Sequence, residues 1–282
     1  MYQGHCLCGA VRYEVEGPFA SMMNCHCSMC RKSHGAPFAT FVSAPLAGFR
    51  WVSGEDSIST YSGSRSFCKV CGAVTPVFMQ EMGLVLCPAG NLDGDLGIKP
   101  QAHLFVGSKA SWYSITDSLP QHVEFPPEFN ARGVERPSVE PKPGVIQGSC
   151  LCGEVAFEIS GTPERLMYCH CSRCRRARSA AHGANLFFKP DQLRWIRGES
   201  LARYYKEPTA RFFSVCFCEK CGSGVPRSNK EYGVAYVPAG SLDTDPGIAP
   251  LARIFVGSKP EWVEITDQVP QFQELPPARP AS

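Results

Sequence analysis

The chain has 282 residues, of which 19% are charged, and a formal net charge of +2. This length fits about two domains of ordinary size, and the composition excludes an intrinsically disordered chain. A charge so close to zero, without a block of like charges, gives no clear nucleic-acid surface. The N-terminus carries no secretory signal, and no apolar run approaches ~18 residues, so we expect a cytoplasmic protein without a membrane partner.

Strand patterns dominate the chain. Short segments that alternate apolar and polar residues, or that form apolar runs beside glycine, predict β-strands. These segments are residues 10–15, 84–86, 103–106, 155–159, 234–237 and 253–256. No segment shows a convincing helical stripe, so the sequence predicts a mostly β protein whose small cores are supplemented by metal.

The second half of the sequence repeats the first. Residues 4–9, Gly-His-Cys-Leu-Cys-Gly, recur at 148–153 with an offset of 144 residues. Residues 68–72 recur at 218–222 with an offset of 150 residues, so the second copy carries six additional residues between 199 and 218. A repeat this long indicates two complete domains and not a solenoid.

We predict domains at residues 1–125 and 146–275. Between them, residues 126–145 form a proline-rich linker, because proline at this density resists both helix and central strand. The sequence leaves open how the domains are arranged, which oligomer the chain forms, and whether one or both copies are active.

Sixteen cysteines dominate the chemistry. In a reducing cytosol, C-x-C and C-x-x-C pairs indicate metal ligands and not disulfides. Two sets of four are predicted to form closed zinc sites, which are structural because tetrahedral zinc is then coordinatively full. These sets are Cys6, Cys8, Cys68 and Cys71, and Cys150, Cys152, Cys218 and Cys221.

Three cysteines remain in each copy. They are Cys25, Cys27 and Cys30, and Cys169, Cys171 and Cys174. A zinc ion with three protein ligands keeps one open position, which is the arrangement of catalytic zinc. Three thiolates make that zinc a poor generator of hydroxide but a good partner for a substrate thiol, which suggests a catalytic role for these six residues. Alternatively, His26 or His170 fills the fourth position, or both sites are purely structural.

The sequence gives weaker evidence for the roles of other side chains. Arg31, Lys32, Arg175, Arg176 and Arg178 follow the three-cysteine clusters and could bind substrate carboxylates or form a solvated basic face. The four tryptophans are expected to pack in the core. Cys87 and Cys216 have no counterpart in the other copy, so we expect them to be packing residues.

These motifs resemble the family of glutathione-dependent formaldehyde-activating enzymes, which shares its domain with centromere protein V. The family pattern G-x-C-x-C-G, C-H-C-x-x-C-R and C-x-x-C-G occurs here twice. The matching segments are residues 4–9, 25–31 and 68–72, and then 148–153, 169–175 and 218–222.

The resemblance implies a mostly β, Mss4-like "β-tent" fold with two zinc ions per domain, about four per chain. It also implies a carbon–sulfur lyase reaction in which glutathione binds the open zinc as a thiolate and attacks formaldehyde, giving S-(hydroxymethyl)glutathione. The alternative that the resemblance allows is a non-catalytic binding or structural module like that of centromere protein V.

Overall fold

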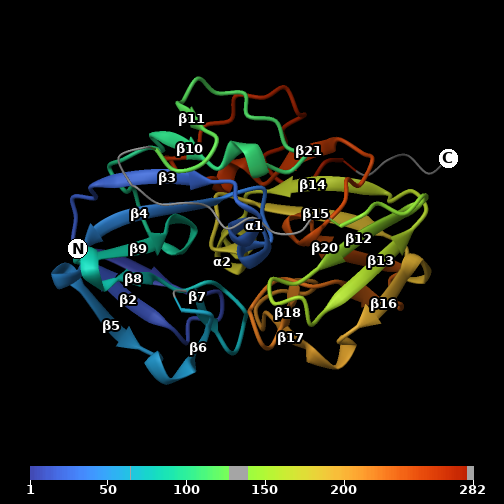
Figure 1. Cartoon of the computed structure of the whole chain (residues 1–282), viewed down its shortest axis with the longest axis horizontal. Helices are drawn as coiled ribbons and strands as arrows, with labels where there is room; N and C mark the ends of the chain where they lie inside the picture. Colours follow the sequence, from blue (N-terminus) through green and yellow to red (C-terminus); the bar gives the residue numbers. More distant parts are fainter. Residues whose placement is uncertain (64, 127–138, 278–282) are drawn as a thin grey trace.

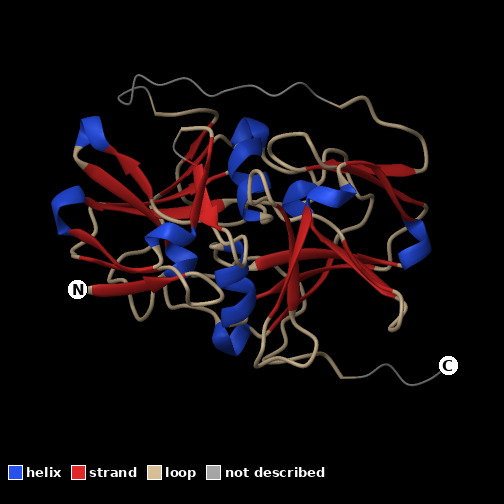
Figure 2. Cartoon of the chain, turned by 90° about the horizontal axis from the view of Figure 1, so that it is seen from below, coloured by secondary structure: helices blue, strands red, loops and turns tan. Residues whose placement is uncertain are grey.

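The computed structural model of the chain describes residues 1–63, 65–126 and 139–277. It consists of two halves that lie side by side, each built mainly from short β-strands (Figures 1 and 2). The predicted mostly β architecture with two similar halves is confirmed. Residues 127–138, the greater part of the predicted linker, lie outside the described residues. No described helix is long and apolar enough to cross a membrane.

The first half contains two larger sheets and one hairpin. The three-stranded sheet has the order β1 (Tyr2–His5), β2 (Arg12–Val15) and β5 (Phe49–Ser53). The six-stranded sheet has the order β11 (Gln121–His122), β10 (Ala102–Leu104), β3 (Ser21–Cys25), β4 (Ala39–Pro45), β9 (Leu84–Pro88) and β8 (Val77–Met79). The hairpin pairs β6 (Ile58–Tyr61) with β7 (Arg65–Cys68).

The second half repeats this plan. Its three-stranded sheet has the order β12 (Val145–Ser149), β13 (Ala156–Ser160) and β16 (Leu193–Arg197). Its five-stranded sheet has the order β19 (Arg227–Asn229), β20 (Val234–Pro238), β15 (Gly183–Phe188), β14 (Arg165–Cys169) and β21 (Pro250–Ile254). The hairpin pairs β17 (Ala202–Lys206) with β18 (Ser214–Cys218).

The six additional residues of the second copy lengthen this hairpin. In the first half the hairpin spans 58–68, eleven residues, whereas in the second half it spans 202–218, seventeen residues. Each strand gains one residue and the connecting loop gains the rest. The insertion therefore changes the surroundings of the hairpin tip and leaves Cys218 in register with Cys68.

Two short helices were not predicted from the sequence. They are α1 (Ser28–His34) and α2 (Ser172–Arg178), each of seven residues. A helix of seven residues makes only two turns, which is too short to show an apolar period. Both helices also begin inside the cysteine motif, where the cysteine spacing indicates metal ligands and not a helix. At each N-terminus a cysteine sulfur caps the helix: the Sγ atoms of Cys27 and Cys171 accept from the backbone N–H groups of Cys30 and Cys174.

The halves share one apolar core, to which both contribute fully buried side chains such as Val42 and Leu186. Helix α1 also packs on the 3-10 turn Ala239–Ser241 of the other half, and α2 packs on the corresponding turn Ala89–Asn91. A Cβ atom on Gly240 would lie 2.3 Å from a backbone oxygen, so only glycine permits this approach. The helix that carries the open cluster of each half therefore rests on the other half.

Candidate metal centres

Two clusters of four cysteines are assembled as predicted. Within each, all four sulfur atoms lie within 4.8 Å of one another. The sulfur atoms of Cys8 and Cys68 are 3.7 Å apart, and those of Cys152 and Cys218 are 3.8 Å apart. Zn–S bonds of ~2.3 Å in a tetrahedron place neighbouring sulfurs about 3.8 Å apart, so the donor set fits zinc.

Local backbone contacts hold these sulfurs in place. The C-x-x-C-G segment turns tightly, with the Gly72 N–H donating to the Cys68 carbonyl at 2.9 Å and a φ of 72° at Gly72. The Val11 N–H donates to the sulfur of Cys6 at 3.4 Å, and Val155 repeats this contact with Cys150 at 3.3 Å. Such N–H···S bonds stabilise thiolate ligands, and four ligands leave the metal no open position, which fits a structural site.

Two clusters of three cysteines form where strand meets helix. Cys25 ends β3, Cys27 caps α1, and Cys30 lies in the first turn of α1. The second half repeats this geometry with Cys169, Cys171 and Cys174, and in each cluster the sulfurs lie within 4.8 Å of one another. Among the described residues, no histidine or carboxylate joins either group as a fourth ligand.

The thiols of each open cluster depend strongly on one another. Hydrogen bonds from the neighbouring cysteines lower the pKa of Cys27 to about 2, and the bond with Cys27 raises the pKa of Cys25 well above its ordinary value. In the second half the pKa of Cys171 is lowered to about 2 and that of Cys169 is raised to about 12 by the same bonding. One thiolate forms readily, but three so close together need a cation to balance them.

His26 and His170 are buried, and neither belongs to a cysteine cluster. Burial, reinforced by nearby positive charge, lowers the pKa of each imidazole to about 3, so both rings are neutral. The Nδ1 atom of each ring is buried without a hydrogen-bond partner among the described residues.

The Nε2 atoms of the two histidines meet different partners. His26 Nε2 lies 2.8 Å from His103 Nδ1, and His103 Nε2 lies 3.0 Å from an Asp117 carboxylate oxygen. At the position that matches His103, Arg253 donates to His170 Nε2 at 3.2 Å. The halves therefore share the histidine and differ in what orients it.

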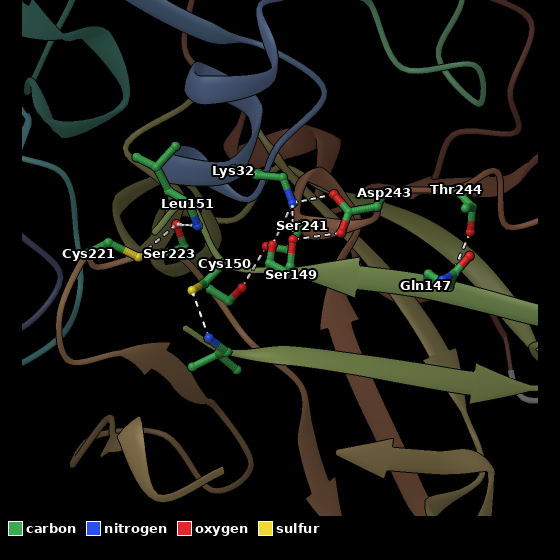
Figure 3. Close-up of polar contacts among 12 residues, drawn as sticks. Lys32, Gln147, Ser149, Cys150, Leu151, Cys221, Ser223, Ser241, Asp243 and Thr244 are labelled. Carbon is green, nitrogen blue, oxygen red and sulfur yellow. Dashed lines mark hydrogen bonds and ion pairs between the residues drawn. The ribbon is translucent and has the colours of Figure 1, made fainter. Parts of the chain in front are cut away.

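Two of the basic residues after the open clusters, Lys32 and Arg176, form ion pairs between the halves. Lys32 Nζ lies 2.5 Å from an Asp243 carboxylate oxygen and donates to the Ser149 carbonyl at 2.6 Å (Figure 3). Both charged side chains are nearly buried, with 5% and 12% exposed. In the matching contact, Arg176 forms an ion pair with Asp93.

The two roles predicted for Lys32 and Arg176, substrate binding and a solvated face, are therefore wrong. The sequence does not show that these side chains cross to the other half. Ser149 directly precedes Cys150, so α1 of the first half is tied to the closed cysteine cluster of the second half (Figure 3).

Sequence reasoning also missed Arg65. Its guanidinium Nη2 atom lies 3.8 Å from the sulfur of Cys30 and therefore belongs to the first open cluster. The one available signal was the alignment of the two copies, in which this arginine stands opposite Val215.

Comparisons with known proteins place both halves in one family. Residues 1–108 and 145–258 each match the profile of the glutathione-dependent formaldehyde-activating enzyme family. A Halomonas elongata protein, provisionally named as such an enzyme, is 32% identical over 127 residues, which cover 41% of this chain and 81% of the relative.

Two further proteins are similar. An uncharacterized lyase of Schizosaccharomyces pombe is 35% identical over 77 residues, covering 25% of this chain and 53% of the yeast protein. A crystal structure of a Rhodobacter sphaeroides protein is 32% identical and covers 30% of this chain and 81% of that protein, with a TM-score of 0.26. The chain thus spans about half the length of the yeast relative and most of the two bacterial ones.

Proposed function

Because the chain belongs to the glutathione-dependent formaldehyde-activating enzyme family, we propose that it is a zinc-dependent carbon–sulfur lyase that joins glutathione and formaldehyde into S-(hydroxymethyl)glutathione. In this proposal, the four-cysteine clusters hold structural zinc and the three-cysteine clusters hold the zinc at which the thiol binds. The latter residues are Cys25, Cys27 and Cys30, and Cys169, Cys171 and Cys174.

One observation carries the proposal: each half contains a complete four-sulfur cluster and a three-sulfur cluster without a fourth described ligand. Zinc bound by three cysteines would supply a soft Lewis acid that favours the thiolate form of an added thiol. The difference in ligand number supports a folding role for the closed clusters and a chemical role for the open ones.

The surroundings of the first open cluster suit a small thiol. Cys25 is partly exposed, which leaves a route from solvent to the sulfurs. Phe105 and Phe125 pack with the cluster, and their ring centroids are 4.6 Å apart. These rings shield one side of the sulfurs from water, which strengthens electrostatic interactions at the cluster.

The reaction needs no further reactant. The thiol proton leaves sulfur, a carbon–sulfur bond forms to formaldehyde as its C=O double bond opens, and the oxygen takes up a proton. Because the product forms without an enzyme as well, catalysis must be measured as an increase in the exchange rate over buffer.

The test is magnetization-exchange NMR on an equilibrium mixture of formaldehyde and glutathione. We expect the zinc-loaded protein to speed exchange and the variant C30S/C174S, which lacks one ligand in each open cluster, to match buffer. The control C216S changes a cysteine outside all four clusters and should keep the wild-type rate. If the zinc-loaded wild type also matches buffer, the lyase proposal fails and a binding or structural module becomes the better account.

A further inference from the structure

The first open cluster has a guanidinium beside it. The Nη1 and Nη2 atoms of Arg65 lie 3.9 and 3.8 Å from the sulfur of Cys30, and Nη1 lies 3.4 Å from Ser33 Oγ. Arg65 begins β7, the strand that ends at Cys68 of the closed cluster. Strand β7 therefore connects Cys68, a predicted ligand of the closed cluster, to the guanidinium of Arg65 beside the open cluster.

Arg65 forms no ion pair with any carboxylate in the described part of the chain. Its hydrogen bonds there go to one sulfur and one hydroxyl, and all are long. A guanidinium has five N–H donors in a planar fork that matches a carboxylate. Most of the hydrogen-bonding capacity of this half-buried group is therefore left for a ligand.

The second open cluster has no guanidinium at the position of Arg65, and the Arg173 near its Cys171 stacks on the ring of Phe213. The position that matches Arg65 is Val215, which is only 2% exposed, and the position that matches Ser33 is Ala177. Val215 and Ala177 belong to one apolar cluster. The polar pair of the first half is thus replaced, at both positions, by an apolar pair.

Charge makes this difference consequential. Zinc with three thiolates has a formal charge of about −1, and a thiolate ligand with a carboxylate adds further negative charge. Near Cys30, the guanidinium offsets that charge and can donate to the carboxylate. The apolar pair at the matching positions can do neither, and Arg178, whose charge acts on Cys174, is buried and donates to Asn185.

We propose that Arg65, positioned by Ser33, makes the first open cluster selective for thiols that carry a carboxylate, whereas the second open cluster does not select for one. This inference rests on the proposed thiol binding at the open clusters. Arg65 is a specificity-determining residue, and the two halves of the chain differ in the thiols they bind.

The test measures thiol binding and not turnover. The open clusters are loaded with Co²⁺, whose absorption changes when a fourth sulfur binds. The probes are N-acetylcysteine and its amide, which differ in one carboxylate. C169S/C174S leaves only the first open cluster, and C25S/C30S leaves only the second. The two thiols also differ in acidity, so the ratio of their affinities at the second cluster serves as the reference for the ratio at the first.

Relative to the second cluster, we expect the first cluster to bind N-acetylcysteine about tenfold more tightly than the amide, as one charge-assisted hydrogen bond predicts. R65M should remove this preference and R65K should restore part of it. A177S/V215R, which transplants the pair into the second half, should create it there.

The outcomes separate the two proposals. Equal preference at both clusters, or a preference that survives R65M, overturns the selectivity while thiol binding stands. Failure of either thiol to bind the cobalt-loaded clusters overturns thiol binding and, with it, the selectivity. A purely structural role for Arg65 predicts that R65M weakens both thiols equally, which also contradicts the proposal.

Discussion

The two open clusters have the same cysteines in the same local geometry, but their neighbours differ. In the first half, Arg65 contacts the cluster and His103 orients the buried histidine. In the second half, Val215 and Arg253 occupy these positions. Duplication has kept the residues that close around a metal and has changed the residues that would meet a ligand. The cysteine clusters are thus the same in both halves, while the charged groups beside them differ.

The two halves also differ in the segments that contain Phe125 and the matching Leu275. Phe125 packs against Phe105 at the first cluster, whereas the matching Leu275 is 66% exposed. The apolar wall over the first cluster is therefore absent from that position in the second half.

Loss of a closed cluster should have the largest effect, and it should be equal in the two halves. C68S and C218S each remove one of four zinc ligands, and structural zinc contributes ~10 kcal/mol in small zinc domains. Because the halves share one core, we expect either variant to lower the melting temperature of the whole chain. Circular dichroism with parallel zinc analysis measures this, with C216S as the control. Selective melting of one half would contradict the shared core.

The two ion pairs between the halves should contribute unequally to the free energy of unfolding. K32M leaves the nearly buried Asp243 without its cation, which typically costs about 3–5 kcal/mol. R176M should cost only about 1 kcal/mol, because its partner Asp93 is 46% exposed. Urea unfolding measures both, and K32M/D243N should recover much of the loss. Equal costs for K32M and R176M would show that burial does not set the difference.

Replacing His103 by arginine should make the first half resemble the second. His103 Nε2 faces the Asp117 carboxylate, and in the tautomer whose Nδ1 accepts a hydrogen bond the proton of His26 lies on Nε2. In H103R the guanidinium donates to that nitrogen, so the proton of His26 moves to Nδ1. ¹⁵N NMR reports the tautomer, and unchanged His26 shifts would contradict this account. H122A, which changes a partly exposed histidine of β11, is the control.

Acid should remove the contribution of one nearly buried carboxylate, Asp267. Burial alone would raise the pKa of Asp267, but its hydrogen bonds and ion pair with Arg253 hold the pKa below its usual value. A lowered folded-state pKa contributes stability above the unfolded value of ~3.9, and this contribution is lost as the pH falls through the folded value. D267N should therefore be less stable than wild type at neutral pH, and the difference should narrow only below about pH 4. The midpoints of urea unfolding, measured for wild type and D267N across this pH range, test whether the difference in stability narrows only at low pH.

The duplication, the strand-rich architecture and the composition of the four cysteine clusters could be read from the sequence. The reason is local: C-x-C and C-x-x-C-G spacings keep sulfurs close whatever surrounds them, and a strand of period two is visible in five residues. The helices α1 and α2 escaped because seven residues cannot show a helical period.

The sequence shows which cysteines can ligate a metal, whereas the structure shows that no described histidine joins the three-cysteine clusters. The tertiary structure alone decided which charges face those clusters. Lys32 and Arg176 follow the cysteine motifs, yet they bind carboxylates of the other half, whereas Arg65, distant in sequence, contacts Cys30. A charged side chain acts across space on whatever the fold brings near it, and neighbours in the sequence do not define that environment.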